Sequence, residues 1–453
     1  MLARMHAEPD SNSIIEPENR RSLRNAHRTL TLVSASLVAV GALAAPVEID
    51  RLGKPARAQG SEALGDLEVM TLNQALGADL GALLEEPPDE LNAALVELLE
   101  NIVAADFPAR AESQAALIAR RLPDVVGLQE VWDLSCEDVE PPSPGEGCSH
   151  PSIAAAFVDH LEVTLDALAA RGLDYEAIAT VRNLDTTTAT LDSVPIGGIP
   201  FVIDGVPALL TSSDRDVILA STTVIDVFPV SFPCLQSEDG CNYQAAAPVA
   251  LTTPAGVLEL DFRRGFVAVD ATVQGREYRF VNTHLEVHEL APGNPLSRFF
   301  QAAQAAELIA TLEMTTPPEL SLIVVGDMNS SPDHEPVPGP LLLPAPFDMG
   351  IPPPYMQFVQ AGYTDIWTLR PGAVPGFTCC QDPDLSNKRS KLSERIDMIF
   401  SLEPPASVRQ ARVVGDRASD KTPPPGPRLW PSDHAGVVAG LRFVEIHAAA
   451  EFN

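Results

Sequence analysis

The sequence predicts a single large α/β domain. Strand-like apolar segments alternate with amphipathic helical segments in the first half of the chain and follow one another directly in the second half. Apolar residues make up 45% of the 453 residues, which is enough for a large core. Neither an internal repeat nor an obvious linker divides the chain, so we expect one domain with decorating loops.

Each element is predicted from its periodicity and from the residues that end it. The predicted strands are 67–72, 124–129, 175–181, a small hairpin at 199–210, 216–220, a hairpin of 265–273 and 277–282, then 321–326, 395–401, 408–414 and 437–443. The predicted helices are 91–102, 109–121, 153–171 and 298–313. Five segments are predicted as loops: the insertions 133–151 and 231–250, the Pro-rich segments 332–354 and 417–431, and the long connection 182–213 apart from its hairpin at 199–210.

The N-terminal 60 residues are predicted to be a signal peptide and leader. Basic residues precede an apolar stretch at 30–45, and sites of the A-x-A type follow at 42–44 and 56–58. The apolar stretch is short for a membrane span, although an uncleaved N-terminal anchor remains the alternative. We therefore expect a secreted or periplasmic protein whose catalytic domain occupies residues 61–453.

The six cysteines agree with export. Two pairs flank the polar insertions and predict two local disulfides: Cys136 with Cys148, and Cys234 with Cys241. The adjacent Cys379 and Cys380 leave their pairing open, because bonding between neighbours is strained. A zinc site is not expected, since no C-x-x-C motif pairs with a second one.

The charge balance disfavours nucleic acid as a partner. The formal net charge is −32, and the chain holds only three Trp and five Tyr. Non-specific nucleic-acid binding depends on Lys and Arg that neutralise phosphates, and on aromatic rings that stack on bases. The best argument for a phosphate-rich substrate is a group of basic residues in the C-terminal third: Lys388, Arg389, Lys391, Arg395, Arg412, Arg417, Lys421 and Arg428. A solvated, charge-balancing loop is the interpretation we favour for them.

Six short polar motifs stand at the ends of predicted strands. They are Thr71-Leu72-Asn73, Gly127-Leu128-Gln129-Glu130, Asn282-Thr283-His284-Leu285, Gly326-Asp327-Met328-Asn329, Arg395-Ile396-Asp397 and Ser432-Asp433-His434. They supply carboxylates, amides and imidazoles but no thiolate, which are ligands for a hard cation such as Mg²⁺ or Mn²⁺ and groups for proton transfer. Each motif alone is an ordinary turn. Their occurrence together at strand ends indicates hydrolysis of a phosphate ester.

This ordered set resembles the endonuclease/exonuclease/phosphatase superfamily, which includes deoxyribonucleases, neutral sphingomyelinases and inositol-polyphosphate 5-phosphatases. The resemblance spans about residues 66–445. It implies a four-layer αββα sandwich, in which two mixed β-sheets pack face to face with helices outside. It also places the active site at one edge of the sheets.

The resemblance implies a role for each motif residue. Asn73, Glu130 and Asp433 would bind the cofactor, Mg²⁺ or Mn²⁺. Asp327 and Asn329 would position the attacking water and the phosphate, and His284 would stabilise the phosphorane oxygens or the leaving group. Asp397 would orient His434, the general base. Whether one or two metal ions bind is left open.

Several departures bear on the substrate. Ala75 stands where abasic-site endonucleases have an Asp, although Asp79 could substitute, and the two insertions lack basic character. We expect a monomeric, secreted phosphodiesterase or phosphatase acting on a phosphoester other than nucleic acid, with a sphingomyelinase-like or phospholipase-C-like lipid hydrolase as one version. That version includes a transient contact with a membrane surface, for which the segment 196–210 with Phe201 is the candidate hairpin. The alternatives are an extracellular endonuclease and a non-catalytic binding module.

Overall fold

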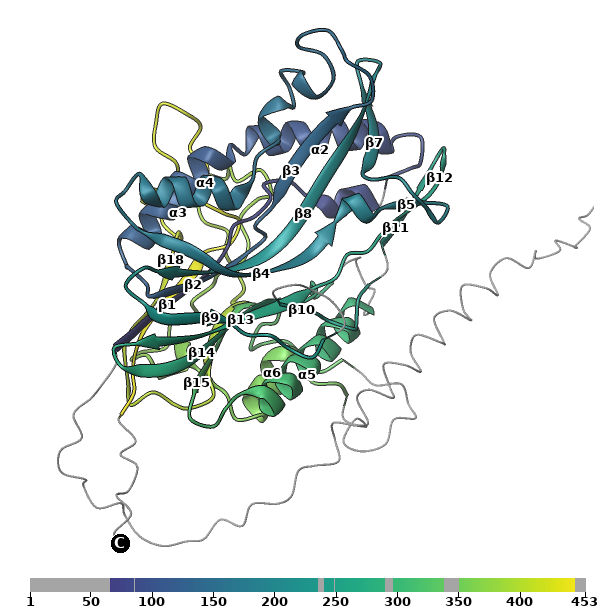
Figure 1. Ribbon diagram of the computed structural model, residues 1–453. Coiled ribbons are helices and arrows are strands. Elements are labelled where there is room, and N and C mark those ends of the chain that lie inside the picture. The colour runs from purple at the N-terminus through teal and green to yellow at the C-terminus, as the bar shows by residue number, and fades with distance from the viewer. Residues whose placement is uncertain are drawn as a thin grey trace, which may run out of the picture. The chain divides into compact units, whose positions relative to one another are not determined.

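Two large mixed β-sheets lie face to face at the centre of the fold (Figure 1). The computed structural model describes residues 66–84, 86–234, 240–247, 249–289, 296–337 and 350–444. The predicted signal peptide and leader, residues 1–60, lie outside the described residues. Within the described part of the chain, no helix is both long enough and apolar enough to span a membrane.

The first sheet has eight strands in the order β18-β19-β1-β2-β8-β3, with β4 and β7 also paired to β8. Its bounds are β1 Asp66–Asn73, β2 Val125–Gln129, β3 Asp133–Asp138, β4 Tyr175–Asp185, β7 Ile199–Ile203, β8 Val206–Ser221, β18 Ser407–Val414 and β19 Gly436–Arg442. Only β1 and β2 pair in parallel. Both strands are almost fully buried, as expected when a strand has neighbours on both faces.

The second sheet has seven strands in the order β10-β13-β14-β15-β17-β16, with β9 paired to β13. Its bounds are β9 Ile225–Pro229, β10 Cys241–Asn242, β13 Gly265–Val273, β14 Arg276–His284, β15 Ser321–Asp327, β16 Thr364–Asp365 and β17 Asp397–Ser401. Here β14 and β15 form the parallel pair. Each sheet therefore contains one parallel pair whose carboxyl ends stop at the same edge.

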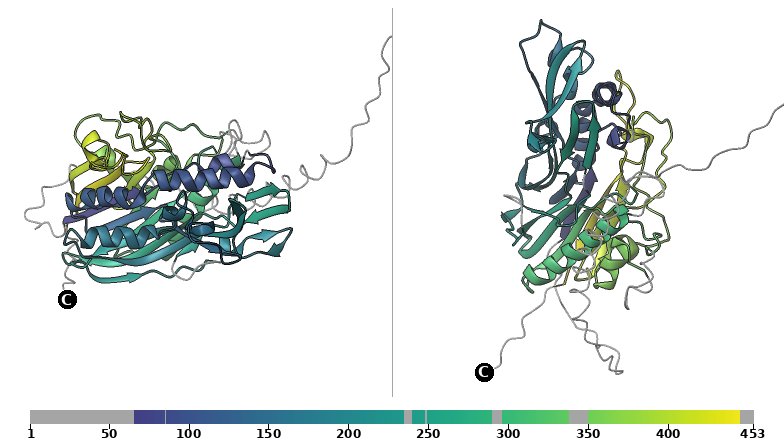
Figure 2. Two further views of the ribbon diagram at one scale, coloured as in Figure 1. Left: turned by 90° about the horizontal axis from the view of Figure 1, so that it is seen from above. Right: turned by 90° about the vertical axis from the view of Figure 1, so that its right-hand side faces the viewer.

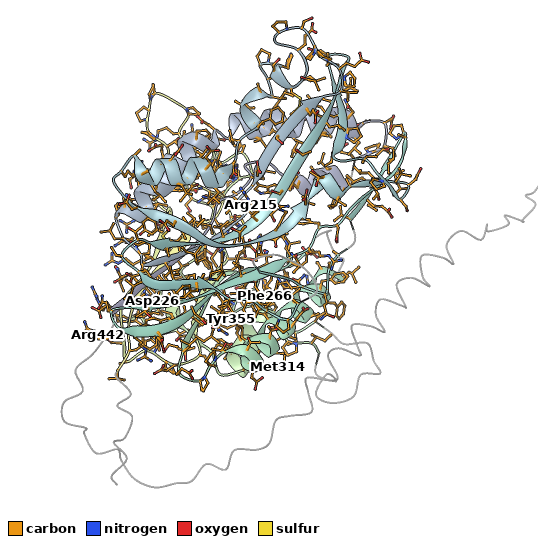
Figure 3. The ribbon with its side chains drawn as sticks, in the orientation of Figure 1. Arg215, Asp226, Phe266, Met314, Tyr355 and Arg442 are labelled. Atoms are coloured by element: carbon orange, nitrogen blue, oxygen red, sulfur yellow. A yellow bond between two sulfur atoms is a disulfide. The ribbon has the colours of Figure 1, made fainter. Side chains whose placement is uncertain are left out.

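Helices cover the outer face of each sheet and complete four layers (Figures 1 and 2). On the first sheet, α3 (Phe107–Ala119) and α4 (His160–Ala169) pack on side chains such as Met70 and Val126, while α2 (Leu91–Ala104) lies farther along. On the second sheet, α5 (Leu296–Thr315) and α6 (Pro354–Gln360) pack on Phe266 and Phe400 (Phe266 is labelled in Figure 3). The predicted αββα sandwich is thus confirmed.

Between the sheets, Asn282 of β14 forms hydrogen bonds to strands β2 and β8 of the first sheet. Its Nδ2 donates to the carbonyl oxygens of Leu128 and Val217, at 2.8 and 3.0 Å. Gln129 Nε2 in turn donates to Asn282 Oδ1 at 2.5 Å. A Cβ atom at Gly127 would lie 2.7 Å from Asn282 Oδ1, so glycine is what permits this close approach.

A third, four-stranded sheet was not predicted. It has the order β11-β12-β5-β6, formed by β5 Thr190–Leu191, β6 Val194–Pro195, β11 Val249–Thr253 and β12 Gly256–Leu260. Its strands come from the long connection 182–213 and from the stretch that follows β10, of which residues 231–250 were predicted as a loop and residues 251–264 carried no prediction. Short strands of this kind gain their ladder only from a distant partner, here Leu258 against Leu191, which local sequence does not reveal.

Other differences from the predictions have local causes. The helix expected from residue 153 begins at His160, because the Asp159 carboxylate caps it by accepting from the backbone N–H of Leu161. The insertion 133–151 starts as strand β3 rather than as loop. The strand predicted at 216–220 extends back to Val206 as β8.

Short 3₁₀ turns and disulfides complete the description. The turns are η1 Leu80–Leu84, η2 Gly147–Ser149, η3 Ala154–Ala156, η4 Thr186–Thr188, η6 Ile366–Leu369 and η7 Ala418–Asp420. Disulfides join Cys136 to Cys148 and Cys234 to Cys241, as predicted, and the adjacent Cys379 and Cys380 also pair.

Candidate active site

The register of the strands brings the six polar motifs to one edge of the sandwich. In the first sheet, Asn73 at the end of β1 lies opposite Gln129 at the end of β2, so that Glu130 follows next to it. In the second sheet, Asp327 at the end of β15 lies between His284 of β14 and Asp397 of β17. His434 precedes β19, which runs antiparallel to β1.

Asp327 is the centre of the resulting cluster. Asn73 Nδ2 donates to Asp327 Oδ2 at 3.2 Å and to Glu130 Oε1 at 2.9 Å, which connects the two sheets. The same Asp327 oxygen lies 3.4 Å from His284 Nε2 and 3.7 Å from His434 Nε2. Burial raises the pKa of Asp327 to about 7, so this carboxyl group depends on its neighbours to hold a charge.

His434 and Asp397 form a hydrogen-bonded pair. Nδ1–H of His434 donates to Asp397 Oδ2 at 2.9 Å, so in the neutral ring Nε2, 3.7 Å from Asp327 Oδ2, is the nitrogen that can accept a proton. Burial alone would lower the pKa of His434, but the carboxylates of Asp397 and Asp327 raise it well above its ordinary value. The imidazole is therefore strongly basic and fixed in direction.

His284 has the opposite environment. Arg264 Nη1 donates to its Nδ1 at 3.1 Å, which leaves the proton of a neutral ring on Nε2. Burial, followed by the positive charges of Arg264 and His434, lowers the pKa of His284 well below its ordinary value. The ring is thus a neutral hydrogen-bond donor pointing toward Asp327.

Asn329 is placed by its own backbone. Its N–H donates to Asp327 Oδ1 at 2.8 Å, and its residue adopts the left-handed conformation (φ 47°) that Asn tolerates better than most residues. Its Nδ2 donates to the Leu285 carbonyl at 3.0 Å and lies 3.1 Å from His284 Nε2. Gln301 of α5 donates to the Asn329 carbonyl at 2.6 Å and anchors this turn to the helix layer.

Glu130 and Asp433 are the carboxylates available to a hard divalent cation, whereas Oδ1 of Asn73 accepts from the backbone N–H of Ala75 at 2.9 Å and its Nδ2 faces Glu130. The charge of Glu130 helps to raise the pKa of Asp433, after burial, so the two carboxylates repel each other. Among the described residues, neither carboxylate forms a direct ion pair with Lys or Arg, although the charge of the buried Arg110 acts on both. Carboxylates are donors that Mg²⁺ and Mn²⁺ prefer, and Asn73 orients Glu130 through its Nδ2.

Arg110 supports the part of the site that contains Glu130 and Asp433. It is fully buried and donates to the carbonyl oxygens of Gln74 (2.8 Å), Ala75 (3.1 Å) and Pro431 (3.2 Å). Burial lowers its pKa to about 10, against the opposing effect of Asp433 and Glu130. The guanidinium therefore ties together the chain segments that carry Asn73 and Asp433.

All eight predicted site residues belong to this cluster, and six of them line one cavity: Glu130, His284, Asp327, Asn329, Asp433 and His434. Asn73 and Asp397 lie behind them, buried. Arg264 and Arg110 were missed. Arg264 follows Arg263, which is partly exposed, and nothing in the sequence distinguishes the two. Arg110 lies in an ordinary helical pattern.

Comparison with known proteins identifies the family of the chain. The model of the Endonuclease/Exonuclease/phosphatase family matches residues 92–434. None of the curated proteins matches the chain.

Similar solved structures include three that cover most of the chain. The endonuclease/exonuclease/phosphatase family protein from Bacteroides thetaiotaomicron is 15% identical, with 87% of this chain and 100% of that chain covered and a TM-score of 0.45. The endonuclease/exonuclease/phosphatase from Beutenbergia cavernae is 19% identical, covering 85% and 73%, with a TM-score of 0.42. D. rerio TDP2, complexed with single strand DNA product, is 16% identical, covering 83% and 98%, with a TM-score of 0.38.

The family match includes five of the six motifs, from Glu130 to His434, and the strand register joins them to Asn73 of the sixth. The chain therefore belongs to the endonuclease/exonuclease/phosphatase family, whose members are typically metal-dependent hydrolases of phosphoesters.

Proposed function

We propose that this protein is a secreted hydrolase that cleaves a phosphodiester by direct attack of water, with Mg²⁺ or Mn²⁺ held by Glu130 and Asp433 beside Asn73. The observation that carries this proposal is the pair of Asp397 and His434, 2.9 Å apart, facing Asp327 at the edge where the metal-binding donors lie. The bound cation would supply positive charge to the phosphoryl oxygens.

The residues of this chain divide the remaining work. Nε2 of His434 accepts a proton from the attacking water as its oxygen forms the new bond to phosphorus and the opposite P–O bond breaks. Asp397 stabilises the imidazolium that results. Asp327 and Asn329 orient the water and the phosphate, and Nε2–H of His284 donates to a phosphoryl oxygen that gains charge.

We propose a substrate that is not a nucleic acid, with a sphingomyelinase-like or phospholipase-C-like phosphodiester as the preferred class. Arg264 is the only Lys or Arg among the described residues that line the cavity, and it is bound to His284. The basic residues of the C-terminal third lie elsewhere: Arg395 is buried against Asp365, and Lys421 donates to the Asn387 carbonyl. A polyanion would find few cations here.

Secretion remains part of the proposal. It is supported by the signal-like pattern of residues 1–60 and by the disulfides Cys136–Cys148 and Cys234–Cys241, which persist in oxidising compartments. We also expect the enzyme to act as a monomer.

A parallel assay tests the function. Purified protein with Mg²⁺ or Mn²⁺ is incubated with sphingomyelin, plasmid DNA and bis(p-nitrophenyl) phosphate, each with and without a strong chelator. Metal-dependent cleavage of the two non-nucleic diesters is expected. Cleavage of DNA alone would support the endonuclease alternative, and no cleavage at all would support a binding module. Activity that survives chelation would contradict the mechanism.

A further inference from the structure

We propose that the cavity beside the catalytic residues holds the hydrocarbon chain of an amphiphilic phosphodiester while its phosphate lies at the metal-binding edge. This inference rests on the proposed function and narrows its substrate class. It concerns the long, apolar part of the cavity, for which the catalytic chemistry has no need.

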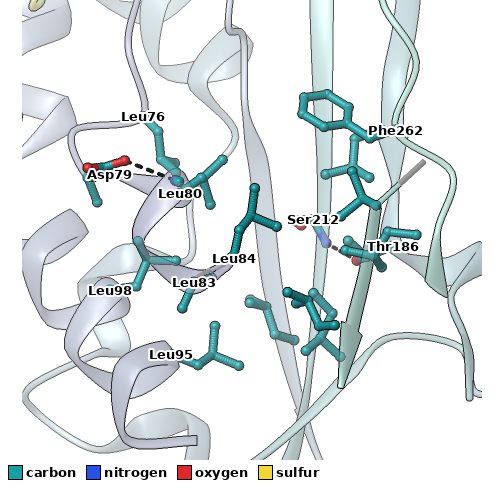
Figure 4. A pocket seen from close by; sticks show the side chains of 18 of the residues that line it. Leu76, Asp79, Leu80, Leu83, Leu84, Leu95, Leu98, Thr186, Ser212 and Phe262 are labelled. Atoms are coloured by element: carbon teal, nitrogen blue, oxygen red, sulfur yellow. Dashed lines mark hydrogen bonds between the residues drawn. The ribbon is translucent and has the colours of Figure 1, made fainter. Parts of the chain in front are cut away.

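The cavity has a volume of about 900 Å³ and is continuous with the catalytic cluster. One wall consists of η1 and α2, whose leucines point across the space toward β8 and the chain opposite, as Figure 4 shows for Leu83, Leu84 and Leu95. The opposite wall includes Leu210 of β8 and Leu258 of β12 in the third sheet. Most of the lining surface in this part is apolar, and leucines make up much of it.

The cavity is partly open to solvent, and its volume falls within the range of ligand-binding pockets. Leu95, Leu210 and Leu258 are no more than 4% exposed, and they enclose space instead of filling it. Water gains few hydrogen bonds among such side chains. An apolar ligand is therefore the natural occupant.

The dimensions suit a lipid chain. A methylene group fills about the volume of a water molecule, ~30 Å³, so the cavity has room for roughly 30 of them. Because this volume includes the catalytic end, where the phosphate would lie, it leaves room for one long chain. Such a chain enters a cavity whose catalytic end binds the phosphate and whose other polar lining residues include Asp79, Asp89 and Glu286. Those carboxylates favour a neutral or cationic head group over an additional phosphate.

The position of Phe201 distinguishes binding of a hydrocarbon chain in the cavity from docking of the hairpin on a membrane surface. The hairpin of β7 and β8 forms as predicted, but Phe201 is only 2% exposed and lines the cavity. The aromatic residue proposed for insertion into a membrane is therefore part of the chain pocket. The hydrocarbon chain of the substrate would bind inside the protein instead of staying in the membrane. Activity on dissolved, single substrate molecules would therefore depend on the length of that hydrocarbon chain.

Alkylphosphocholines with 4, 8, 12 and 16 carbons test this, since they are phosphodiesters that carry one chain. Binding is measured by calorimetry with a chelator present, and hydrolysis with Mg²⁺ or Mn²⁺, both below the concentration at which each probe aggregates. We expect affinity and kcat/KM to rise by up to roughly fourfold per methylene until the cavity is filled. Affinity independent of chain length, or an effect seen only on aggregates, would overturn the inference.

Two variants and a control locate the effect. Ala208→Phe adds a ring at a buried cavity position of β8 and should lose the gain for 12 and 16 carbons while retaining the 4-carbon probe. If that variant does not fold, Leu83→Asp on η1 places a charge in the same cavity and should also weaken long chains. Leu402→Glu, 42% exposed and outside the cavity, is the control and should change nothing. Unchanged chain selectivity in both cavity variants would contradict the assignment.

The outcomes separate the two proposals. Chain-dependent binding with a chelator but no hydrolysis of any diester would keep the chain pocket and reject the proposed function. Hydrolysis of bis(p-nitrophenyl) phosphate and of all four probes at equal rates would keep the function and reject the pocket.

Discussion

The guanidinium of Arg264 donates a hydrogen bond of 3.1 Å to Nδ1 of His284. A histidine held in this way cannot carry its proton on that nitrogen, so Nε2–H is directed at the cluster around Asp327. Asp214 lies 3.8 Å behind the arginine, and the positions of Arg264 and His284 are therefore coupled to β8 of the first sheet. Arg264 acts through His284, as a positioning residue.

Arg264→Gln should reduce kcat by roughly 10- to 100-fold, because a hydrogen bond from a charged donor is lost and the His284 tautomer is no longer fixed. KM should change little, since the substitution removes no contact with the substrate's chain. Arg264→Lys should restore part of kcat. Arg263→Gln, at the neighbouring and more exposed position, is the control, and equal losses in both variants would refute the role.

The hydrogen-bonded pair of His434 and Asp397 can be tested by substitution, with folding checked in parallel. His434→Ala should lower kcat by roughly 10²- to 10⁴-fold, the usual contribution of a positioned base, and should also lower the melting temperature, because the buried Asp397 carboxylate loses its partner. Asp397→Asn should cause a smaller loss, since the imidazole keeps its place but loses the carboxylate that stabilises its charged form. His150→Ala, on a partly exposed histidine outside the cavity, should retain full activity. Comparable activity in His434→Ala and the parent protein would rule out the mechanism.

Metal binding has a readout that does not depend on activity. A cation that binds only the folded protein raises its stability by about 2.7 kcal/mol at 100 times the dissociation constant. Titration with Mg²⁺ or Mn²⁺ should therefore raise the melting temperature, and Glu130→Gln should abolish most of the shift. Glu137→Gln, on an exposed carboxylate of β3, should leave it intact. A shift that persists in Glu130→Gln would place the metal elsewhere.

Asp216 predicts an unusual dependence of stability on pH. It is fully buried, and neither carboxylate oxygen finds a hydrogen-bond partner in the described structure. Burial and then the neighbouring Asp214 raise its pKa well above the ordinary value. The folded state keeps this proton at pH values where the unfolded chain has lost it, so the group destabilises the fold by about 1.4 kcal/mol per pH unit above its unfolded pKa, until the folded pKa is reached.

Asp216→Asn removes the carboxyl group whose proton is retained in the folded state and lost in the unfolded state. The variant should be more stable than the parent protein at pH 7, and the difference in melting temperature should shrink as the pH falls toward 4. Asp226→Asn, on a residue of the edge strand β9 with a largely exposed side chain, provides the comparison and should show no such trend. A difference that is constant with pH would mean that Asp216 is ionised in the folded state.

Much of the fold and of the site could be predicted because polar residues interrupt long apolar runs. Asn73 and Asp327 end strands that are buried on both faces, and Glu130 follows another, so each polar group interrupts an apolar run where the strand stops. The helices α2 to α5 were also evident from their spacing, whereas α6, Pro354–Gln360, was not predicted. Only α4 began late, since the cap made by Asp159 depends on local geometry that periodicity does not encode.

The rest depends on contacts between segments far apart in the sequence. Thr190 and Leu191 become a strand only because Glu259 and Leu258 lie opposite them. Arg264 differs from Arg263 only in the side chains that happen to surround it. Phe201 looked like an exposed hairpin aromatic because the sequence does not reveal that α2 and the third sheet enclose it.

The third sheet also has a consequence for how such an enzyme could be redesigned. Its four strands lie in two connections, between β4 and β7 and between β10 and β13, whereas the reacting groups follow strands of the two large sheets. Connections tolerate changes in length and sequence far better than packed strands do. Hairpins of different length could therefore be grafted into these two connections. The same phosphoester chemistry would then act on longer or shorter amphiphiles. Substrate recognition and catalysis could thus be changed independently of each other.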